Sequence, residues 1–227
     1  LVRNDLMWAS TDVQGKVLAS LAGFNIAWLH DSIRTIGSSY SQAPLLKRIQ
    51  DQGKKIQLVV GQVDEDYDAG TGARVLSSTC PWGFGLPLSK VNLTLYEKRL
   101  KANLSAYKNA GVDVKAVEVG NELDLFCFNG DVPLTRSATA ADYKLFAESY
   151  AKFLEKTVSV VKQPAYYPNA KIILGAPAID WSPASGKMDP GQMYAALRNV
   201  CGRLQMPLTT IERLSPCMTE FCALTLK

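Results

Sequence analysis

The run VEVGNELDLF at residues 117–126 holds three carboxylates, Glu118, Glu122 and Asp124, together with a glycine and an amide. Its first half alternates apolar and polar residues, a pattern typical of a half-buried strand. A carboxylate at the end of such a strand can act as a general acid or base. Glu122 has this position. The alternative is an ordinary glutamate that forms a salt bridge or caps the next helix.

Glycosidic bonds are cleaved by two carboxyl groups that flank the anomeric carbon. In this chemistry Glu122 would be the acid/base, and the amide of Asn121 could hold the sugar 2-hydroxyl, where contacts strengthen in the transition state. Glu118 alternates with two valines and is expected to point into the fold, where a buried carboxylate needs a partner. Asp124 is expected to be a loop or cap residue.

Helical and strand-like segments alternate along the chain. Helices are predicted at 12–23, 43–53, 93–110, 138–162 and 189–200, and strands at 24–29, 54–63, 114–122 and 170–179. Repeated βα units imply a parallel sheet with covering helices, either doubly wound or a (β/α)8 barrel. No Gly-rich phosphate motif follows a strand, which argues against nucleotide binding and favours the barrel. We expect a single α/β domain over 1–227 of the (β/α)8 TIM-barrel type, truncated or incomplete, in which 201–227 are doubtful.

Polar and aromatic residues follow each predicted strand and would share one rim of this sheet. His30 follows the first strand and is expected to line the pocket as a hydrogen-bonding group. Trp181 follows the last strand, and Trp82 lies in the Gly- and Pro-rich stretch 64–90, which is expected to be a binding loop. Both tryptophans could offer flat apolar faces to a sugar ring or pack within the fold. The acidic run 64–68 is expected to be a solvated loop.

The run VEVGNELD, the long helix after it and the strand PNAKIILG resemble the fourth βα unit and fifth strand of clan A retaining glycoside hydrolases. The form with Gly before Asn121-Glu122 is most similar to the branch of heparanase-like β-glucuronidases, α-L-arabinofuranosidases and β-xylosidases. The resemblance covers roughly residues 12–180. It implies a (β/α)8 barrel with Glu122 as acid/base, a carbohydrate substrate and no cofactor or metal.

The same resemblance implies a second Glu as nucleophile after a later strand, and Glu220 in the run CMTEFC matches that position. Three positions depart from the pattern. Leu123 stands where Pro is frequent, Cys222 where Gly is usual, and His30 where an Arg normally holds the nucleophile. About 38 residues separate the fifth strand from Glu220, which is short for the intervening elements, since one βα unit takes about 30 residues.

Composition narrows the remaining function classes. The chain has 227 residues and a net charge of +4, without a run of basic residues, so no nucleic-acid partner is expected. There is no apolar run of about 18 residues, so no membrane insertion is expected. The five cysteines form no zinc pattern. A Ser-His-Asp triad would have to use His30, the single histidine, and the sequence has no nucleophile elbow G-x-S-x-G.

Sequons at Asn92 and Asn103 are weakly permissive of secretion, so a secreted or extracellular location is expected, although no signal peptide is recognisable. The function expected is retaining hydrolysis of O-glycosidic bonds in a polysaccharide or oligosaccharide. Two alternatives stay open: a non-catalytic carbohydrate-binding barrel and an inactive fragment of a hydrolase. The sugar, the linkage and the oligomeric state do not follow from the sequence.

Overall fold

The computed structural model describes residues 2–3, 15–16, 28–32, 43–70, 74–81, 83–178 and 186–203, with the backbone alone at 2–3, 28–32 and 201–203. The helix predicted over 12–23 falls outside these residues except for Gly15 and Lys16, which are helical. Trp82, Trp181 and Glu220 also lie outside them.

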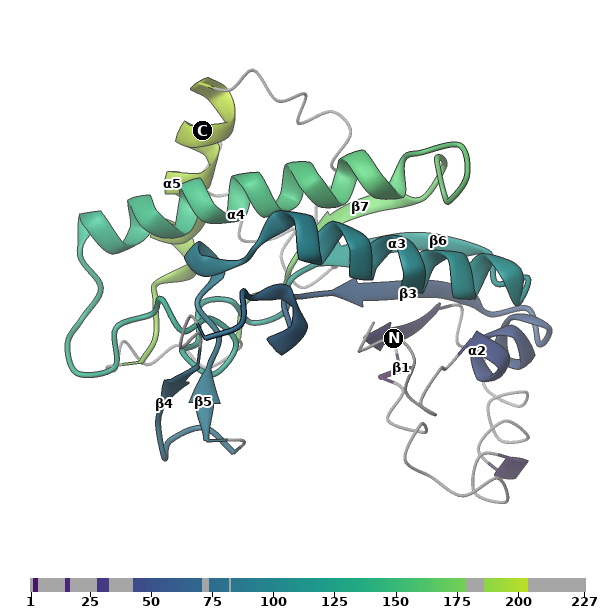
Figure 1. The fold of residues 1–227 in the computed structure, drawn as a ribbon, viewed down its shortest axis with the longest axis horizontal. Helices are drawn as coiled ribbons and strands as arrows, with labels where there is room; N and C mark the ends of the chain where they lie inside the picture. Colours follow the sequence, from purple (N-terminus) through teal and green to yellow (C-terminus); the bar gives the residue numbers. More distant parts are fainter. Residues whose placement is uncertain are drawn as a thin grey trace.

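Five parallel strands form the main sheet of the described chain (Figure 1). They are β1 (Val2–Arg3), β2 (Trp28–Ser32), β3 (Lys55–Val60), β6 (Val114–Val119) and β7 (Lys171–Leu174). Their order in space, β1-β2-β3-β6-β7, follows the chain without a reversal. A doubly wound sheet reverses its strand order at a switch point, whereas a β/α barrel does not. The described strands therefore have the order of a barrel sheet.

Four described helices accompany the sheet: α2 (Ala43–Gln50), α3 (Leu93–Asn109), α4 (Ala140–Val161) and α5 (Pro190–Arg203). Right-handed crossovers that all advance in one direction place their helices on one face of a sheet. In accordance with this rule, α3 packs against α4 and α4 against α5, and Figure 1 shows α3 and α4 side by side. Among the described helices, α4 is the longest, and none has the length and apolarity that a membrane span needs.

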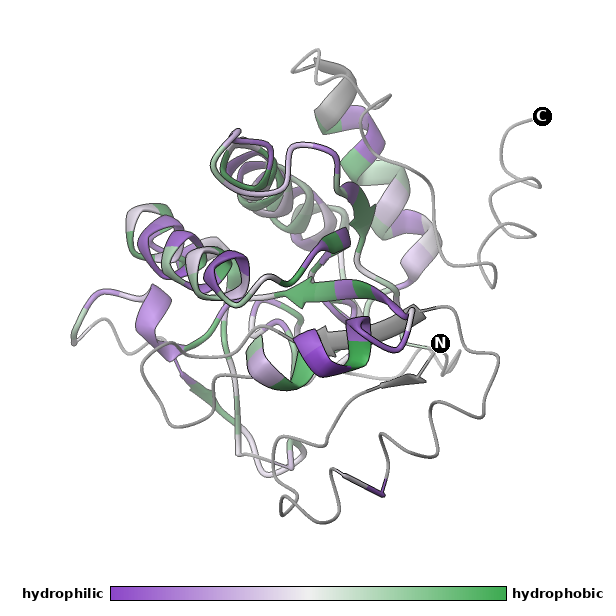
Figure 2. Ribbon diagram, turned by 90° about the vertical axis from the view of Figure 1, so that its right-hand side faces the viewer, coloured by the Kyte–Doolittle hydropathy of each residue, from purple (hydrophilic) through white to green (hydrophobic). Residues whose placement is uncertain are grey.

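The expected α/β class with a parallel sheet is confirmed, but a closed barrel is not seen. Among the described strands, β1 and β7 each pair with one neighbour, so this sheet is open. The helix-side face of β3 and β6 carries the core residues Leu58, Val60, Val117 and Val119. Figure 2 shows the apolar colour concentrated on the strands, while the helices carry both colours. Because side chains alternate along a strand, Glu118 lies on the face opposite to the helices.

The element bounds agree with the sequence pattern where amphipathic periodicity is long. The predicted helices 93–110, 138–162 and 189–200 correspond to α3, α4 and α5. The first predicted strand, 24–29, was ended too early, because β2 (Trp28–Ser32) continues to Ser32, so His30 lies within a strand and not after it; residues 24–27 lie outside the described chain. The strand predicted over 114–122 ends at Val119, and Glu122 belongs to the loop that follows.

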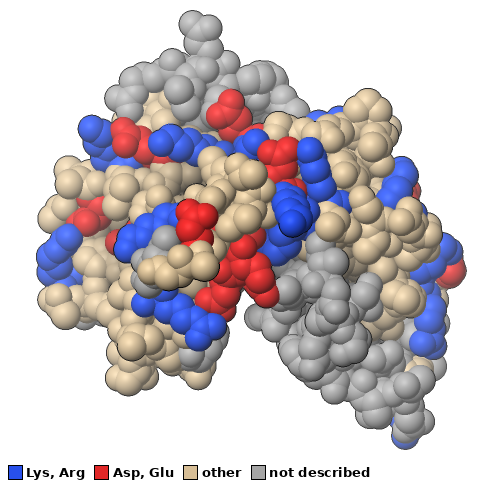
Figure 3. Space-filling view, viewed as in Figure 1, with Lys and Arg blue, Asp and Glu red and all other residues tan. Residues whose placement is uncertain are grey.

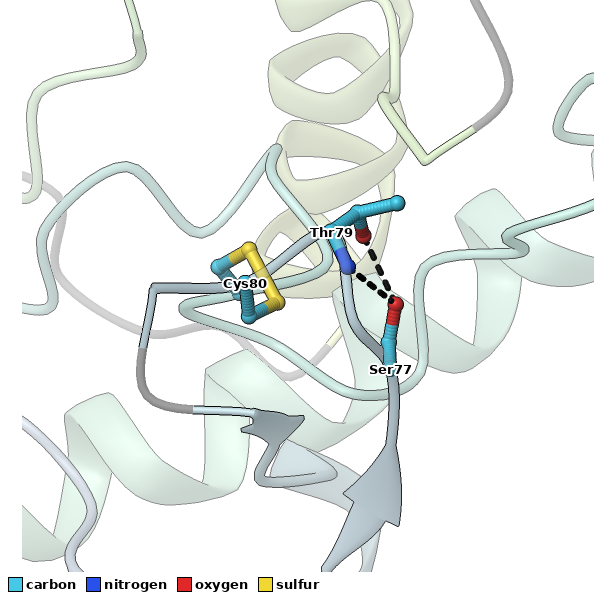
Figure 4. The surroundings of a disulfide bond; sticks show 4 residues. Ser77, Thr79 and Cys80 are labelled. Atoms are coloured by element: carbon cyan, nitrogen blue, oxygen red, sulfur yellow. Dashed lines mark hydrogen bonds between the residues drawn. A yellow bond between two sulfur atoms is a disulfide. The ribbon is translucent and has the colours of Figure 1, made fainter.

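The stretch 64–90, expected to be a binding loop, contains short regular elements in its described residues. The segment contains the 3-10 helices η2 (Asp64–Asp66) and η3 (Leu88–Lys90) and an antiparallel hairpin of β4 (Val75–Leu76) and β5 (Phe84–Gly85). A disulfide joins Cys80 in this hairpin to Cys127 in the loop after β6 (Figure 4). Beside it, Ser77 Oγ accepts a hydrogen bond from the Thr79 backbone N–H. The segment is thus fastened to the loop that carries Glu122.

The acidic run 64–68 is not simply a solvated loop. Asp66 is fully buried and accepts two hydrogen bonds of 2.7 Å from the Arg99 guanidinium, which also donates to the Gly61 carbonyl. A buried carboxylate needs such a partner because it loses its hydration. This ion pair ties η2 to α3 and so holds the loop after β3.

The two sequons give no support to glycosylation. The Asn92 side chain caps α3 by accepting from the backbone of Thr94 and Leu95, and it donates to Asp68. Asn103 is buried on α3, with 7% of its surface exposed. Attachment of a glycan needs an exposed asparagine, so Asn103 is too buried in this fold, whereas Asn92 is half-buried and acts as a helix cap.

Removal of the disulfide is expected to destabilise the protein. Cys80 and Cys127 are 47 residues apart, and the chain-entropy relation gives roughly 4 kcal/mol for a loop of that length. Replacing both residues by serine should lower the free energy of unfolding in urea by about this amount. As a control, dithiothreitol should destabilise the native chain and leave the double variant unchanged. Equal free energies of unfolding for the native chain and the double variant in the absence of dithiothreitol would contradict the Cys80–Cys127 disulfide.

Candidate active site

The carboxyl end of β6 is held by hydrogen bonds from both sides. The Gly120 N–H donates to the Val60 carbonyl at 2.6 Å, which extends the pairing with β3. The Tyr150 hydroxyl, on α4, donates to the Val119 carbonyl at 2.6 Å and accepts from the Gly175 N–H at 3.1 Å. One buried phenol therefore joins the last residue of β6 to the first residue after β7.

Gly175 allows this close approach. A Cβ at this position would lie 2.7 Å from the carbonyl oxygens of Val119 and Gly120, closer than real Cβ atoms come. The segment after β7 then runs beside the loop after β6. The Glu122 N–H donates to the Ala176 carbonyl at 2.8 Å, and the Ala176 N–H donates to Glu118 Oε1 at 2.9 Å.

Glu118 is buried and paired, in agreement with the sequence-based expectation. Its residue is 6% exposed, and Oε2 accepts from the Gln57 amide of β3 at 2.7 Å. With Oε1 bound to Ala176, this carboxylate joins β3, β6 and the segment after β7 on the face opposite to the helices. Both oxygens are engaged in the fold.

Asp124 lies in the loop after β6, as predicted, and it is buried, which the sequence did not indicate. It is 2% exposed, and its Oδ1 accepts from the Ala178 N–H at 2.9 Å. Burial is the main cause that raises its pKa to about 6, and the negative charge of Glu122 adds to the rise. Two opposing effects, the hydrogen bonds from backbone N–H groups and the charge of Lys187, lower it.

Glu122 itself differs from both neighbouring carboxylates. It is half-buried, and its side chain makes no hydrogen bond or ion pair with any residue that the structure describes. Its φ is +48°, the one non-glycine residue with positive φ in the described chain. Left-handed backbone at a side chain of this size costs about 1–2 kcal/mol and is concentrated at functional sites. A salt bridge or helix cap, the ordinary alternative, is not seen among the described residues.

The other predicted site residues are placed only in part. Asn121 lies next to Glu122, half-buried, and its amide has no hydrogen bond to a described residue. His30 lies in register with Gln57, two residues before β2 ends, and its side chain is not described. Trp82, Trp181 and the predicted nucleophile Glu220 are outside the described residues. The structure thus brings together Asn121, Glu122, Glu118 and Asp124 and leaves the role of each a prediction.

Sequence reasoning missed Tyr150, Gly175 and the burial of Asp124. No local signal marks Tyr150, which has an ordinary core position on an amphipathic helix. Gly175 carried a signal, since a glycine directly after a β-rich run marks a close backbone approach.

The described surface shows no large basic field on the face drawn in Figure 3, where basic and acidic side chains are interspersed. Within the described chain, no group of three His, Cys, Asp or Glu side chains could hold a metal ion. The expected absence of nucleic-acid and metal partners stays a prediction.

Removing the Tyr150 hydroxyl should destabilise the fold. In Tyr150→Phe the buried Val119 carbonyl and Gly175 N–H lose their common partner, which costs about 1–3 kcal/mol. Urea unfolding followed by tryptophan fluorescence measures the change. Tyr166→Phe is the matched control, because its hydroxyl has no hydrogen-bond partner among the described residues. An equal decrease in the free energy of unfolding in the two variants would contradict the role of the Tyr150 hydroxyl in joining β6 to the segment after β7.

The strained backbone at Glu122 predicts that one substitution stabilises the protein, whereas most substitutions destabilise it. Asn adopts left-handed backbone more readily than Glu, so Glu122→Asn should raise the free energy of unfolding by about 1 kcal/mol. Glu122→Gln keeps a long side chain and should leave stability within about 0.5 kcal/mol of native. Both are measured by chemical denaturation. Destabilisation by Asn relative to Gln would show that the backbone at this position is not strained.

Comparison with known proteins gives little further information. No family model and no curated protein matches the chain. Among solved structures, the catalytic domain of GH30 xylanase C from Talaromyces cellulolyticus is similar, with 17% identity and a TM-score of 0.48. The match covers 88% of this chain and 48% of that domain, so this chain spans about half its length. A similarity of this size establishes neither a family nor an activity for this chain.

Proposed function

We propose that the chain is a retaining O-glycoside hydrolase, built on a (β/α)8-type barrel, which acts on a polysaccharide or oligosaccharide. The observation that carries the proposal is Glu122. It is a carboxylate in strained backbone at the carboxyl edge of a parallel sheet, the edge at which β/α folds bind their ligands. Its carboxylate is uncommitted among the described residues, whereas Glu118 and Asp124 beside it accept hydrogen bonds within the fold.

In this mechanism Glu122 protonates the leaving oxygen as the glycosidic bond breaks. A second carboxylate attacks the anomeric carbon and forms a glycosyl-enzyme, and Glu122 then takes a proton from the water that hydrolyses it. Asn121 would hold the sugar 2-hydroxyl, with His30, Trp82 and Trp181 as further substrate contacts. Glu220 is proposed as the nucleophile on the resemblance of its surrounding residues alone. Asp124 is too buried for attack on a sugar.

The disulfide supports a location for the proposed enzyme. Disulfides persist in secreted and extracellular proteins and are rare in the cytosol. We therefore propose a secreted or extracellular protein on the basis of Cys80–Cys127, and not on the sequons.

Replacement of Glu122 by glutamine should abolish most hydrolysis. The test uses the 4-nitrophenyl β-D-xyloside, β-D-glucoside, β-D-glucuronide and α-L-arabinofuranoside, with nitrophenolate release as the readout. General acid–base catalysis contributes about 10²–10⁴-fold, so kcat of Glu122→Gln on the best substrate should fall by that factor. Glu148→Gln on α4 is the control for the same chemical change at an exposed carboxylate.

Azide separates an acid/base from a structural residue. In Glu122→Ala the glycosyl-enzyme hydrolyses slowly because no base activates water, and azide needs no base to attack it. Azide should therefore raise the rate and give a glycosyl azide of the substrate's configuration. Full activity of Glu122→Gln would overturn the assignment. Binding of xylan or oligosaccharides without any cleavage would favour the carbohydrate-binding barrel, and neither binding nor cleavage would favour an inactive fragment.

A further inference from the structure

Asp124 fastens the loop after β6 to the chain after β7 at two points. Its Oδ1 accepts from the Ala178 N–H at 2.9 Å, and its backbone carbonyl accepts from the Met188 N–H at 2.7 Å. The contact continues through the bridge between Leu125 and Lys187. A single buried residue thus binds both the segment that leaves β7 and the segment that leads into α5.

This attachment lies directly beyond Glu122. The Glu122 N–H is bound to the Ala176 carbonyl, and two residues later in both segments Asp124 is bound to Ala178. Strained backbone persists only where the surrounding structure over-determines it. The bond from Asp124 to Ala178 supplies the constraint on the carboxyl side of Glu122, as the bond from Gly120 to Val60 does on the other side.

The carboxyl group of Asp124 also interacts with Glu122 through charge. The charged groups that act on it are Glu122 on the same loop and Lys187 on the segment before α5. Negative charge on Glu122 favours the neutral form of Asp124, whereas Lys187 favours the ionised form. Burial has the largest effect and, with the charge of Glu122, raises the pKa of Asp124 to about 6 against the opposing charge of Lys187.

We propose that Asp124 is a positioning residue for Glu122, which holds the strained loop against the segment after β7 and forms with Glu122 a pair of interacting carboxyl groups. Its catalytic consequence rests on the proposed function of Glu122. The attachment of the loop by Asp124 and the interaction between the two carboxyl groups are independent of that proposed function. Asp124 touches no substrate in this proposal and acts through the position and charge state of its neighbour.

The interaction is tested without any substrate. Protein labelled with ¹³C at the aspartate carboxyl carbon is titrated from pH 3 to 9 by NMR, and Asp124→Asn identifies the Asp124 signal. We expect a midpoint near 6 in the native chain and a lower midpoint in Glu122→Gln, in which the neighbouring negative charge is absent. Glu148→Gln should leave the midpoint unchanged. The same midpoint in native protein and Glu122→Gln would overturn the proposed pair.

Kinetics on the best 4-nitrophenyl glycoside test the positioning role. Asn retains the Oδ1 acceptor for Ala178 and removes the charge, whereas Ala removes both. We expect kcat to fall about 10²-fold in Asp124→Ala with KM within about threefold of native, because misplacement of a catalytic group by about 1 Å has such an effect. Asp124→Asn should retain most of kcat and lose any step in its pH profile near 6. Asp113→Asn, at an exposed carboxylate at the opposite edge of β6, is the control.

The outcomes separate this inference from the proposed function. No hydrolysis by the native chain, with the Asp124 midpoint shifted in Glu122→Gln, would overturn the function and leave the pair supported. Hydrolysis that depends on Glu122, with native kcat in Asp124→Ala, would overturn the positioning role. If Asp124→Ala does not fold, the titration and the pH profile of Asp124→Asn decide.

Discussion

The arrangement of the site depends on how the end of β6 is fastened to the start of the segment after β7. The Tyr150 hydroxyl accepts from one strand end and donates to the other, and it is buried under α4. Backbone groups that leave a strand lose their ladder partners, and in a buried place each needs a replacement. Tyr150 supplies two of these replacements with one atom, and Gly175 supplies the space that brings the two chains together.

The carboxylates then divide into two kinds. Glu118 and Asp124 accept backbone N–H groups of the segment after β7, which holds that segment against the loop after β6. Glu122, between them in sequence, contributes its backbone N–H to the same contact and leaves its carboxylate outside it. Glu122 also differs from Glu118 and Asp124 in its backbone, which has a left-handed φ of +48°. The strained backbone at Glu122 costs free energy, and it persists because the flanking hydrogen bonds hold the loop. Such strain is common at functional sites.

The sequence predicted those parts of the fold that depend on local periodicity. The helices α3 and α4 and the strand β6 follow from the spacing of their apolar residues, and the parallel sheet follows from the alternation of helices and strands. The burial of Glu118 followed from its place between two core valines. Side chains at every second position of a strand lie on the same face of the sheet, so the face of each side chain can be read from the sequence.

Other features depend on residues far away in the chain. Asp66 looks like part of a solvated acidic run, and it is buried because Arg99, 33 positions later, supplies its partner. Asp124 is buried through Ala178, 54 positions away, and the β4–β5 hairpin is fixed by Cys127. The end of the first predicted strand was placed too early, because pairing with β3 continues through Ser32 and includes the polar residues His30 and Asp31.

The proposed function requires Glu122 to be the acid/base of a retaining glycosidase. It is tested most directly by ¹H NMR of the anomeric proton in the first product released from the best 4-nitrophenyl glycoside, observed before mutarotation. The account predicts a first product with the same anomeric configuration as the substrate, at a rate that collapses in Glu122→Gln. A first product of inverted configuration, or retained configuration at the native rate in Glu122→Gln, would contradict it.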